Sequence, residues 1–216
     1  MEATNFRRGF RELFLRALDH ALGCPADSAD IQSATTVEAA AVIERYRVDW
    51  NENCDPYNLE FTAFLIGAYR TLQRRMPPVS SRTIIEAALD LGFAWLTDKS
   101  RAGLDAAQDP FVMLTDISRE REQRFFGTNF AFDRPRDDNA AYHLDVTRCW
   151  YVEICIAEGE RALAPVFCSF DKAWFKAVNP GRDGFVFRRP TTIANGDDRC
   201  RFYFERIANS PRPGRS

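Results

Sequence analysis

The chain of 216 residues is 45% hydrophobic and carries 31 acidic and 29 basic side chains, for a net charge of −2. Because this charge is close to zero, no overall field attracts the protein to nucleic acid or to an anionic membrane, and we expect neither as a partner. No run of about 18 apolar residues occurs, so we also expect no membrane-spanning helix.

The first hundred residues have the periodicity of amphipathic helices. Residues 5–22 place apolar side chains at helical spacing with charged ones between them, which predicts a first helix. The same charges interrupt the apolar run that a signal peptide needs, so we expect a cytoplasmic protein. Three further helices are expected to begin at residues that can cap a first turn: Thr35 or Thr36, Asp55 or Asn58, and Ser80 or Ser81.

Beyond residue 100 the pattern changes. Residues 100–122 contain a mixture of apolar and charged side chains, and we expect them to link the helical region to the part that follows. The elements predicted after it are strands at 123–134, 141–149, 185–194 and 199–207, a loop at 134–139, and helices at 149–160 and 162–178. This order predicts an α+β fold, in which an N-terminal helical bundle is followed by an antiparallel sheet with helices packed on one face.

The domain organisation follows from the same change of pattern. We expect a helical region over residues 1–100, an α+β domain over residues 101–207 and a disordered tail over residues 208–216. Within the second domain, the dipeptide Asn195-Gly196 predicts a tight type I′ hairpin turn, because both residues tolerate a positive φ. Such a turn does not explain why Arg189, Thr192 and Cys200 lie close to it.

Six cysteines are present, and four of them lie in the final third of the chain. In a cytoplasmic protein we expect thiols, ligands or nucleophiles rather than disulfides. Cys155 lies on the apolar face of a predicted helix and is expected in the core. Cys149 lies where a strand meets that helix, and a helix N-terminus would lower its pKa. Cys200 shares a strand face with Phe202, so we expect it to be covered.

The order of several motifs resembles one family. These are RCWY at residues 148–151, Cys168 followed three residues later by Asp171, and R-x-x-T-x-x-x-G-x-x-x-C-x-F from Arg189 to Phe202. Together they resemble the L-2-amino-thiazoline-4-carboxylic acid hydrolase family over about residues 110–206. The resemblance implies a ring-opening hydrolase that converts 2-aminothiazoline-4-carboxylate to N-carbamoyl-cysteine, and a hydrolase-like character for the second domain.

The candidate catalytic residues are Cys168, Asp171 and His143. Cys168 and Asp171 are one helical turn apart, so they share a face. A nearby carboxylate raises the pKa of a thiol, and activation of Cys168 therefore needs a cation such as Arg189, Arg148 or His143. His143 is also the candidate imidazole base, although a polar position on the solvated face of a strand is the favoured explanation for it.

The candidate substrate-binding residues are Arg189, Thr192, Cys149 and Cys200, on one wall of a pocket whose other wall is the helix of Cys168. A covered Arg189 needs an anion, which is either a substrate carboxylate or an internal partner, Asp171 or Asp145. Thr192 points to the opposite face in a regular strand, unless a bulge at Pro190 brings both to one side.

A zinc site is an alternative explanation for three of the cysteines. Cys149, Cys168 and Cys200 are possible ligands, with His143 or Asp171 as the fourth, but the short C-x-x-C spacing of zinc knuckles is absent. We therefore expect neither a metal nor a cofactor.

The sequence thus favours a hydrolase that opens a small heterocyclic ring at a C–N or C–S bond of a cyclic amidine or amide. Either Cys168 attacks the electrophilic carbon, or Asp171 deprotonates a water that attacks it. The alternative is a non-catalytic small-molecule-binding or sensor domain. In both cases the expected partner is a small molecule, and whether the chain forms a homodimer is left open.

Overall fold

The computed structural model describes residues 3–23, 28–47 and 55–208, so Cys24, Cys54 and nearly all of the expected tail lie outside the described residues. The helices are α1 (Ala3–Leu22), α2 (Ser28–Tyr46), α3 (Tyr57–Gln73), α4 (Pro78–Gly92), α5 (Ala94–Ala106), α6 (Pro110–Arg121), α7 (Trp150–Ala157), α8 (Ala164–Phe170), α9 (Lys172–Phe175) and α10 (Pro180–Asp183). The strands are β1 (Ala131–Asp137), β2 (Ala141–Arg148), β3 (Phe185–Arg188) and β4 (Cys200–Arg206). None of the described helices is long and apolar enough to cross a membrane.

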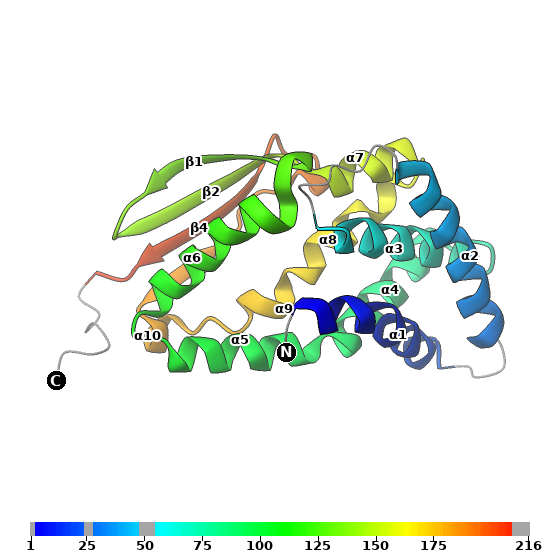
Figure 1. Cartoon of the computed structure of the whole chain (residues 1–216), viewed down its shortest axis with the longest axis horizontal. Coiled ribbons are helices and arrows are strands. Elements are labelled where there is room, and N and C mark those ends of the chain that lie inside the picture. Colours follow the sequence, from blue (N-terminus) through cyan, green and yellow to red (C-terminus); the bar gives the residue numbers. More distant parts are fainter. Residues whose placement is uncertain (1–2, 24–27, 48–54, 209–216) are drawn as a thin grey trace.

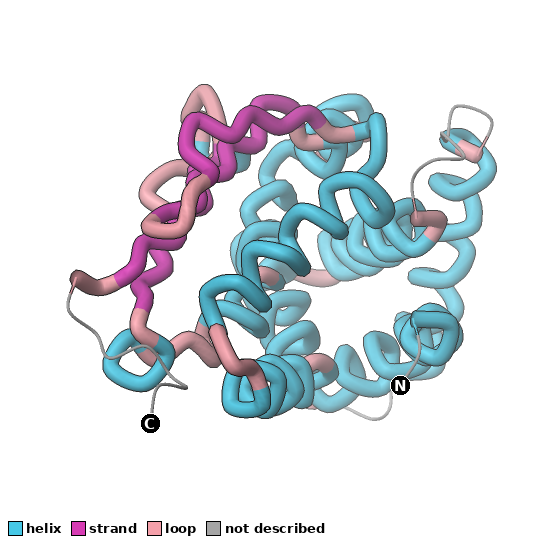
Figure 2. The backbone as a smooth tube through the Cα atoms, turned by 60° about the vertical axis from the view of Figure 1, so that its left-hand side comes forward, coloured by secondary structure: helices cyan, strands magenta, loops and turns pink. Residues whose placement is uncertain are grey.

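The strands form one antiparallel sheet in the order β1-β2-β4-β3. The sheet lies along one side of the molecule and the helices lie on the other (Figures 1 and 2). The predicted α+β fold, with helices on one face of an antiparallel sheet, is therefore confirmed. Leu144 pairs with Phe202 and Val146 with Cys200 on the face toward the helices, whereas His143 pairs with Tyr203 on the opposite face.

Two hydrophobic clusters hold these layers together. The larger one joins the N-terminal helices to α7 and α8, as the edge-to-face contact between Phe61 and Phe167 shows, with ring centroids 5.5 Å apart. The smaller one packs α5 and α6 against the sheet through Phe111, Phe185 and Phe204.

Helices α2 and α3 approach each other at Gly67. A Cβ atom at this position would lie 2.6 Å from the carbonyl oxygen of Thr35 and 2.9 Å from the amide nitrogen of Ala39. Since both of these are backbone atoms, only a residue without a side chain allows the two helices to lie this close.

Several expected boundaries in the helical part are wrong. Thr35 and Thr36 lie inside α2, which begins at Ser28, and the hydroxyl of Thr36 donates to the carbonyl of Gln32 within the helix. The fourth helix begins at Pro78, whose fixed φ suits a first turn. The segment 100–122, expected as a link, instead forms most of α5 and α6. A cap explains the start of α6, because the side chain of Asp109 accepts the amide of Val112.

The strand and helix boundaries in the second half also differ from expectation. Residues 122–129 form short turns of π- and 3-10 helix, so β1 starts only at Ala131. It then continues through the expected loop to Asp137, and its pairing with β2 shifts between Asp133 and Arg136, where Pro135 cannot donate a hydrogen bond. The helix expected at 162–178 is divided into α8 and α9, which meet at Asp171.

The hairpin between β3 and β4 is present, but the expected two-residue turn is wrong. Strand β3 ends at Arg188, and Ile193–Asn195 form a 3-10 turn that is followed by Gly196 at φ 102°. The carboxylate of Asp197 accepts the amide of Thr192 at 2.9 Å, and this bond closes the loop. The loop therefore has a fixed shape that places residues 192 and 193 beside the first residue of β4.

Candidate functional site

Two thiols meet where α8 faces the β3–β4 hairpin. Cys168 lies on α8, and Cys200 begins β4 on the face toward the helices. The thiols of Cys168 and Cys200 share a hydrogen bond. The sulfur of Cys200 also accepts the backbone amide of Ile193, with a nitrogen to sulfur distance of 3.2 Å. Of the two thiols, Cys200 is the one that accepts a backbone N–H, and this arrangement favours a thiolate at Cys200.

The pKa values of the two thiols are shifted in opposite directions. The hydrogen bond with Cys168 lowers the pKa of Cys200, with further lowering from the Ile193 amide and the charge of Arg189. The pKa of Cys168 is raised by its hydrogen bond to Cys200, by burial and by the nearby charge of Asp171. Cys168 was the expected nucleophile, but the arrangement favours Cys200 as the thiolate and Cys168 as its proton-bearing partner.

An ion pair lies next to the thiols. The guanidinium of Arg189 donates to a carboxylate oxygen of Asp171 at 2.6 Å and to the carbonyl oxygen of Cys168 at 2.9 Å. Its carbon lies 5.9 Å from the ring centre of Phe175 and 5.3 Å from that of Phe202. Of the two partners expected for a covered Arg189, the structure contains an internal one, Asp171.

Asp171 combines a deep position with access to solvent. Burial raises its pKa, against the charge of Arg189, a hydrogen bond from Trp174 and the charge of Arg121. Even so, 32% of its side chain is accessible. The carboxyl group of Asp171 is therefore partly accessible, and its raised pKa makes it a stronger base than an ordinary aspartate.

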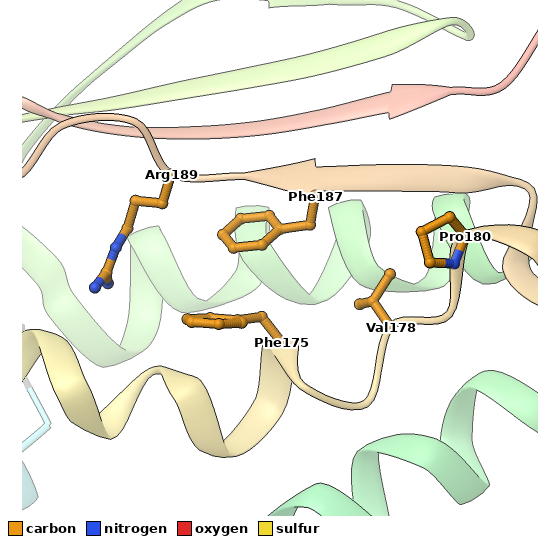
Figure 3. A pocket seen from close by; sticks show the side chains of 5 residues that line it. All are labelled: Phe175, Val178, Pro180, Phe187 and Arg189. Atoms are coloured by element: carbon orange, nitrogen blue, oxygen red, sulfur yellow. The ribbon is translucent and has the colours of Figure 1, made fainter.

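A pocket of about 320 Å³ opens next to this ion pair. It is lined by residues of β3 and of the segment from α9 to α10: Phe175, Val178, Pro180, Phe187 and Arg189. Figure 3 shows the ring of Phe187 next to that of Phe175 in the pocket wall, with the guanidinium of Arg189 at one end, and the centres of the two rings are 5.2 Å apart. Its volume is at the lower end of the range for small-molecule sites, which suits a ligand of one small ring.

Thr192 has a buried hydroxyl beside the thiol pair. The residue is 6% exposed, and its hydroxyl oxygen has no hydrogen-bond partner within the described part of the chain. The alternation expected for a strand does not apply, because residues 189–199 form the loop between β3 and β4. Since a buried hydroxyl without a partner is costly, Thr192 is suited to bind a polar group of a ligand.

The other two described cysteines behave differently from each other. Cys149 is the residue before the first turn of α7, but burial raises its pKa to about 12, so the expected lowering by the helix N-terminus is outweighed. The charges of Cys200 and Asp171 act on Cys149, which places it near the same cluster. Cys155 is fully buried in the larger core, as expected.

The structure does not bring His143 to the cluster. Its ring stacks on Tyr203 on the outer face of the sheet, with centroids 4.1 Å apart, and its Nε2 atom lies 3.1 Å from Glu205. Burial lowers the pKa of His143. Over residues 3–23, 28–47 and 55–208, no group of three or more metal-binding side chains is suited to hold an ion. The expected zinc alternative therefore lacks a site among these residues.

Two polar residues of the interior were missed in the sequence. The hydroxyl of Tyr151 donates to the side chain of Asn58, whose amide donates to the carbonyl of Phe125 at 2.6 Å. Tyr151 belongs to the RCWY motif, and Asn58 is a fully buried amide on α3. The sequence signal that could have identified Asn58 is the presence of a polar amide among the apolar residues of α3.

The thiol assignment can be tested by titration. The ultraviolet absorbance of thiolates is followed against pH in the wild-type protein and in Cys200→Ser, and the second curve is subtracted from the first. We expect this difference to show one ionisation with a midpoint below the ordinary thiol pKa of about 8.5. Asp171→Asn should move this midpoint to still lower pH, because it removes a negative charge that raises the pKa of both thiols. A midpoint that disappears in Cys168→Ser but persists in Cys200→Ser would reverse the assignment.

Comparison with known families matches residues 57–204 to the family described as L-2-amino-thiazoline-4-carboxylic acid hydrolase. The match contains Cys168, Asp171, Arg189 and Cys200. It begins at the first residue of α3, so it covers more of the chain than the expected 110–206. No curated protein and no solved structure matches the chain.

Proposed function

Because the chain belongs to the L-2-amino-thiazoline-4-carboxylic acid hydrolase family, we propose that it opens the ring of a small cyclic amidine by hydrolysis. The family is named for a hydrolase, and the proposal adds the bond and the residues. The observation that carries it is the contact of the Cys168–Cys200 thiol pair with the Asp171–Arg189 ion pair. This contact supports our assignment of a nucleophile, a proton donor and a base to one cluster.

In the mechanism that we favour, Cys200 attacks as the thiolate. Its sulfur forms a bond to the amidine carbon of the ring, the bond from that carbon to the ring sulfur breaks, and the leaving sulfur takes the proton of Cys168. Asp171 then deprotonates a water, which attacks the carbon now attached to Cys200. The carbamoyl product leaves, Cys200 returns to the thiolate, and the proton held by Asp171 restores the thiol of Cys168.

The second mechanism needs no covalent intermediate. Asp171 deprotonates a water that adds directly to the amidine carbon, and Cys168 protonates the leaving sulfur. The raised pKa of Asp171 supports either role as a base. The lowered pKa of Cys200 supports only the covalent route, because direct attack by water has no use for that thiolate.

Arg189 has a different role in this proposal from the one expected. Its donors face Asp171 and the carbonyl of Cys168, so we propose that it orients Asp171 rather than binding a substrate carboxylate. We propose that the ring binds in the pocket beside the paired rings of Phe175 and Phe187, at its Arg189 end, and that Thr192 supplies a hydroxyl for its exocyclic nitrogen.

The test is a ring-opening assay on a small panel: 2-aminothiazoline-4-carboxylate, other cyclic amidines and cyclic imides. We expect 2-aminothiazoline-4-carboxylate to yield a free thiol and a product heavier by one water, detected by thiol titration and mass spectrometry. Cyclic imides contain no ring sulfur and release no thiol, so their hydrolysis would show that the protein cleaves a C–N bond. Tight binding of a panel member without product would instead favour the alternative of a small-molecule-binding domain.

A further inference from the structure

The pocket beside Arg189 is lined mostly by hydrocarbon. Four of its five lining side chains, those of Phe175, Val178, Pro180 and Phe187, contain only carbon and hydrogen. The fifth is that of Arg189, and Figure 3 shows it at one end of the pocket, with Val178 and Pro180 toward the opposite end. The lining at the end away from Arg189 is therefore suited to an apolar group.

The charge of Arg189 is already compensated within the protein. Its guanidinium donates to Asp171 at 2.6 Å and to the carbonyl oxygen of Cys168 at 2.9 Å, and only 12% of its side chain is accessible. A second carboxylate that bound Arg189 from the pocket would lie close to the negative charge of Asp171, and two like charges at such a distance repel each other. The one charged residue of the lining is therefore poorly suited to an acidic ligand.

The aromatic wall of the pocket is supported by further rings. The ring of Trp174 contacts those of Phe187 and Phe175 edge to face, with centroids 5.0 and 5.7 Å apart. Phe187 also lies 5.0 Å from Phe204, a buried residue of the smaller hydrophobic cluster. Because packed rings of this kind cannot rotate freely, we expect the pocket to keep its shape without a ligand.

The size of the pocket exceeds that of a five-membered ring alone. An apolar cavity of about 150 Å³ is enough to hold benzene, and the volume here is about 320 Å³. We propose that this pocket binds an alkyl substituent of the substrate, so that the protein prefers rings with an apolar side group to rings with a carboxylate. This inference rests on the proposed function. The ring lies at the Arg189 end, and its alkyl group extends toward Val178 and Pro180.

The experiment compares two substrates with substituents of similar shape, 2-aminothiazoline-4-carboxylate and 2-amino-4-isopropyl-2-thiazoline. Both substituents are branched groups of the same number of non-hydrogen atoms, but only the carboxylate carries a negative charge. We expect kcat/KM to be about 10- to 100-fold higher for the isopropyl ring, mainly through a lower KM, because the pocket removes its methyl groups from water and desolvates the carboxylate.

A substitution at the far end of the pocket tests the placement of the alkyl group. Val178→Lys should reverse the preference, because the ammonium group attracts the carboxylate and makes the pocket less apolar. The matched control is Val186→Lys, the same change at a half-buried valine of β3 that pairs with Glu205 on the outer face of the sheet. It should leave the preference of the wild type unchanged, and unfolding curves should show that both variants are folded.

Equilibrium binding of both rings, measured by calorimetry, separates this inference from the proposed function. Tighter binding of the isopropyl ring without opening of either ring would overturn the proposed hydrolysis and support the apolar pocket. Opening of both rings with equal kcat/KM, or with a higher value for the carboxylate, would overturn the apolar pocket alone. An equal loss on both rings in Val178→Lys would also overturn it, because it would indicate a structural role for Val178. Protein that neither binds nor opens either ring would overturn both.

Discussion

Replacing Cys200 by serine is expected to lower kcat for ring opening by about ten-thousandfold, since a serine hydroxyl is not ionised near neutral pH and no longer acts as the nucleophile. The structure supports a large effect because Cys200 accepts the amide of Ile193 and shares a hydrogen bond with Cys168. The measurement is single-turnover and steady-state formation of free thiol from 2-aminothiazoline-4-carboxylate. Unfolding curves should show that the variant keeps its fold.

Two further cysteine variants make this result specific. Cys168→Ser should lose about a hundredfold, because it weakens proton donation to the leaving sulfur while the nucleophile remains. Cys155→Ala removes a thiol that is fully buried in the larger core, and activity should be retained. If Cys168→Ser is the inactive variant and Cys200→Ser is not, the attacking thiol is Cys168. If both retain turnover, the direct attack by water is correct, and Asp171→Asn should be inactive.

Replacing Gly67 by alanine is expected to lower the free energy of unfolding by about 3 kcal/mol, because overpacking against rigid atoms is costly. The new Cβ atom would lie 2.6 Å from the carbonyl oxygen of Thr35, and backbone cannot rotate away as a side chain can. The helices α2 and α3 would have to separate along their contact. This cost exceeds the gain of about 1 kcal/mol that alanine has over glycine within a helix. Urea unfolding of the two proteins measures the difference.

Gly103 in α5 provides the matched control. A Cβ atom there would have Met113 as its nearest neighbour, at 3.8 Å, which is an ordinary contact. Gly103→Ala should therefore raise the free energy of unfolding by about 0.5 to 1 kcal/mol from helix propensity alone. If Gly67→Ala were as stable as the wild type, the close approach of α2 and α3 would be wrong.

Local patterns were sufficient for some features of the site. The alternation of β4 predicted that Cys200 is covered, and the helical spacing predicted that Cys168 lies close to Asp171. The need of a covered guanidinium for an anion predicted a partner for Arg189, with Asp171 among the alternatives. Each of these predictions depends on a few neighbouring residues, which a single sequence specifies.

Other features depend on contacts between distant segments. The turn signal of Asn195-Gly196 is overridden because Asp197 binds the amide of Thr192, and this loop then sets the environment of Cys200. The bond between Tyr151 and Asn58 joins residues 93 positions apart, and no periodicity contains it. The sequence therefore predicted the layers and the thiols, but not which thiol is favoured as the anion.

The outermost strands of the sheet have a consequence for self-association. An exposed strand edge with free backbone groups is a template on which a second chain can add its own strand. In β1 the edge is interrupted by Pro135 and carries charged side chains on both sides of it, whereas β3 ends after four residues and is followed closely by Pro190. These features discourage the growth of a continuous sheet from one molecule to the next, so we expect two copies of this chain not to associate by adding strands at these edges.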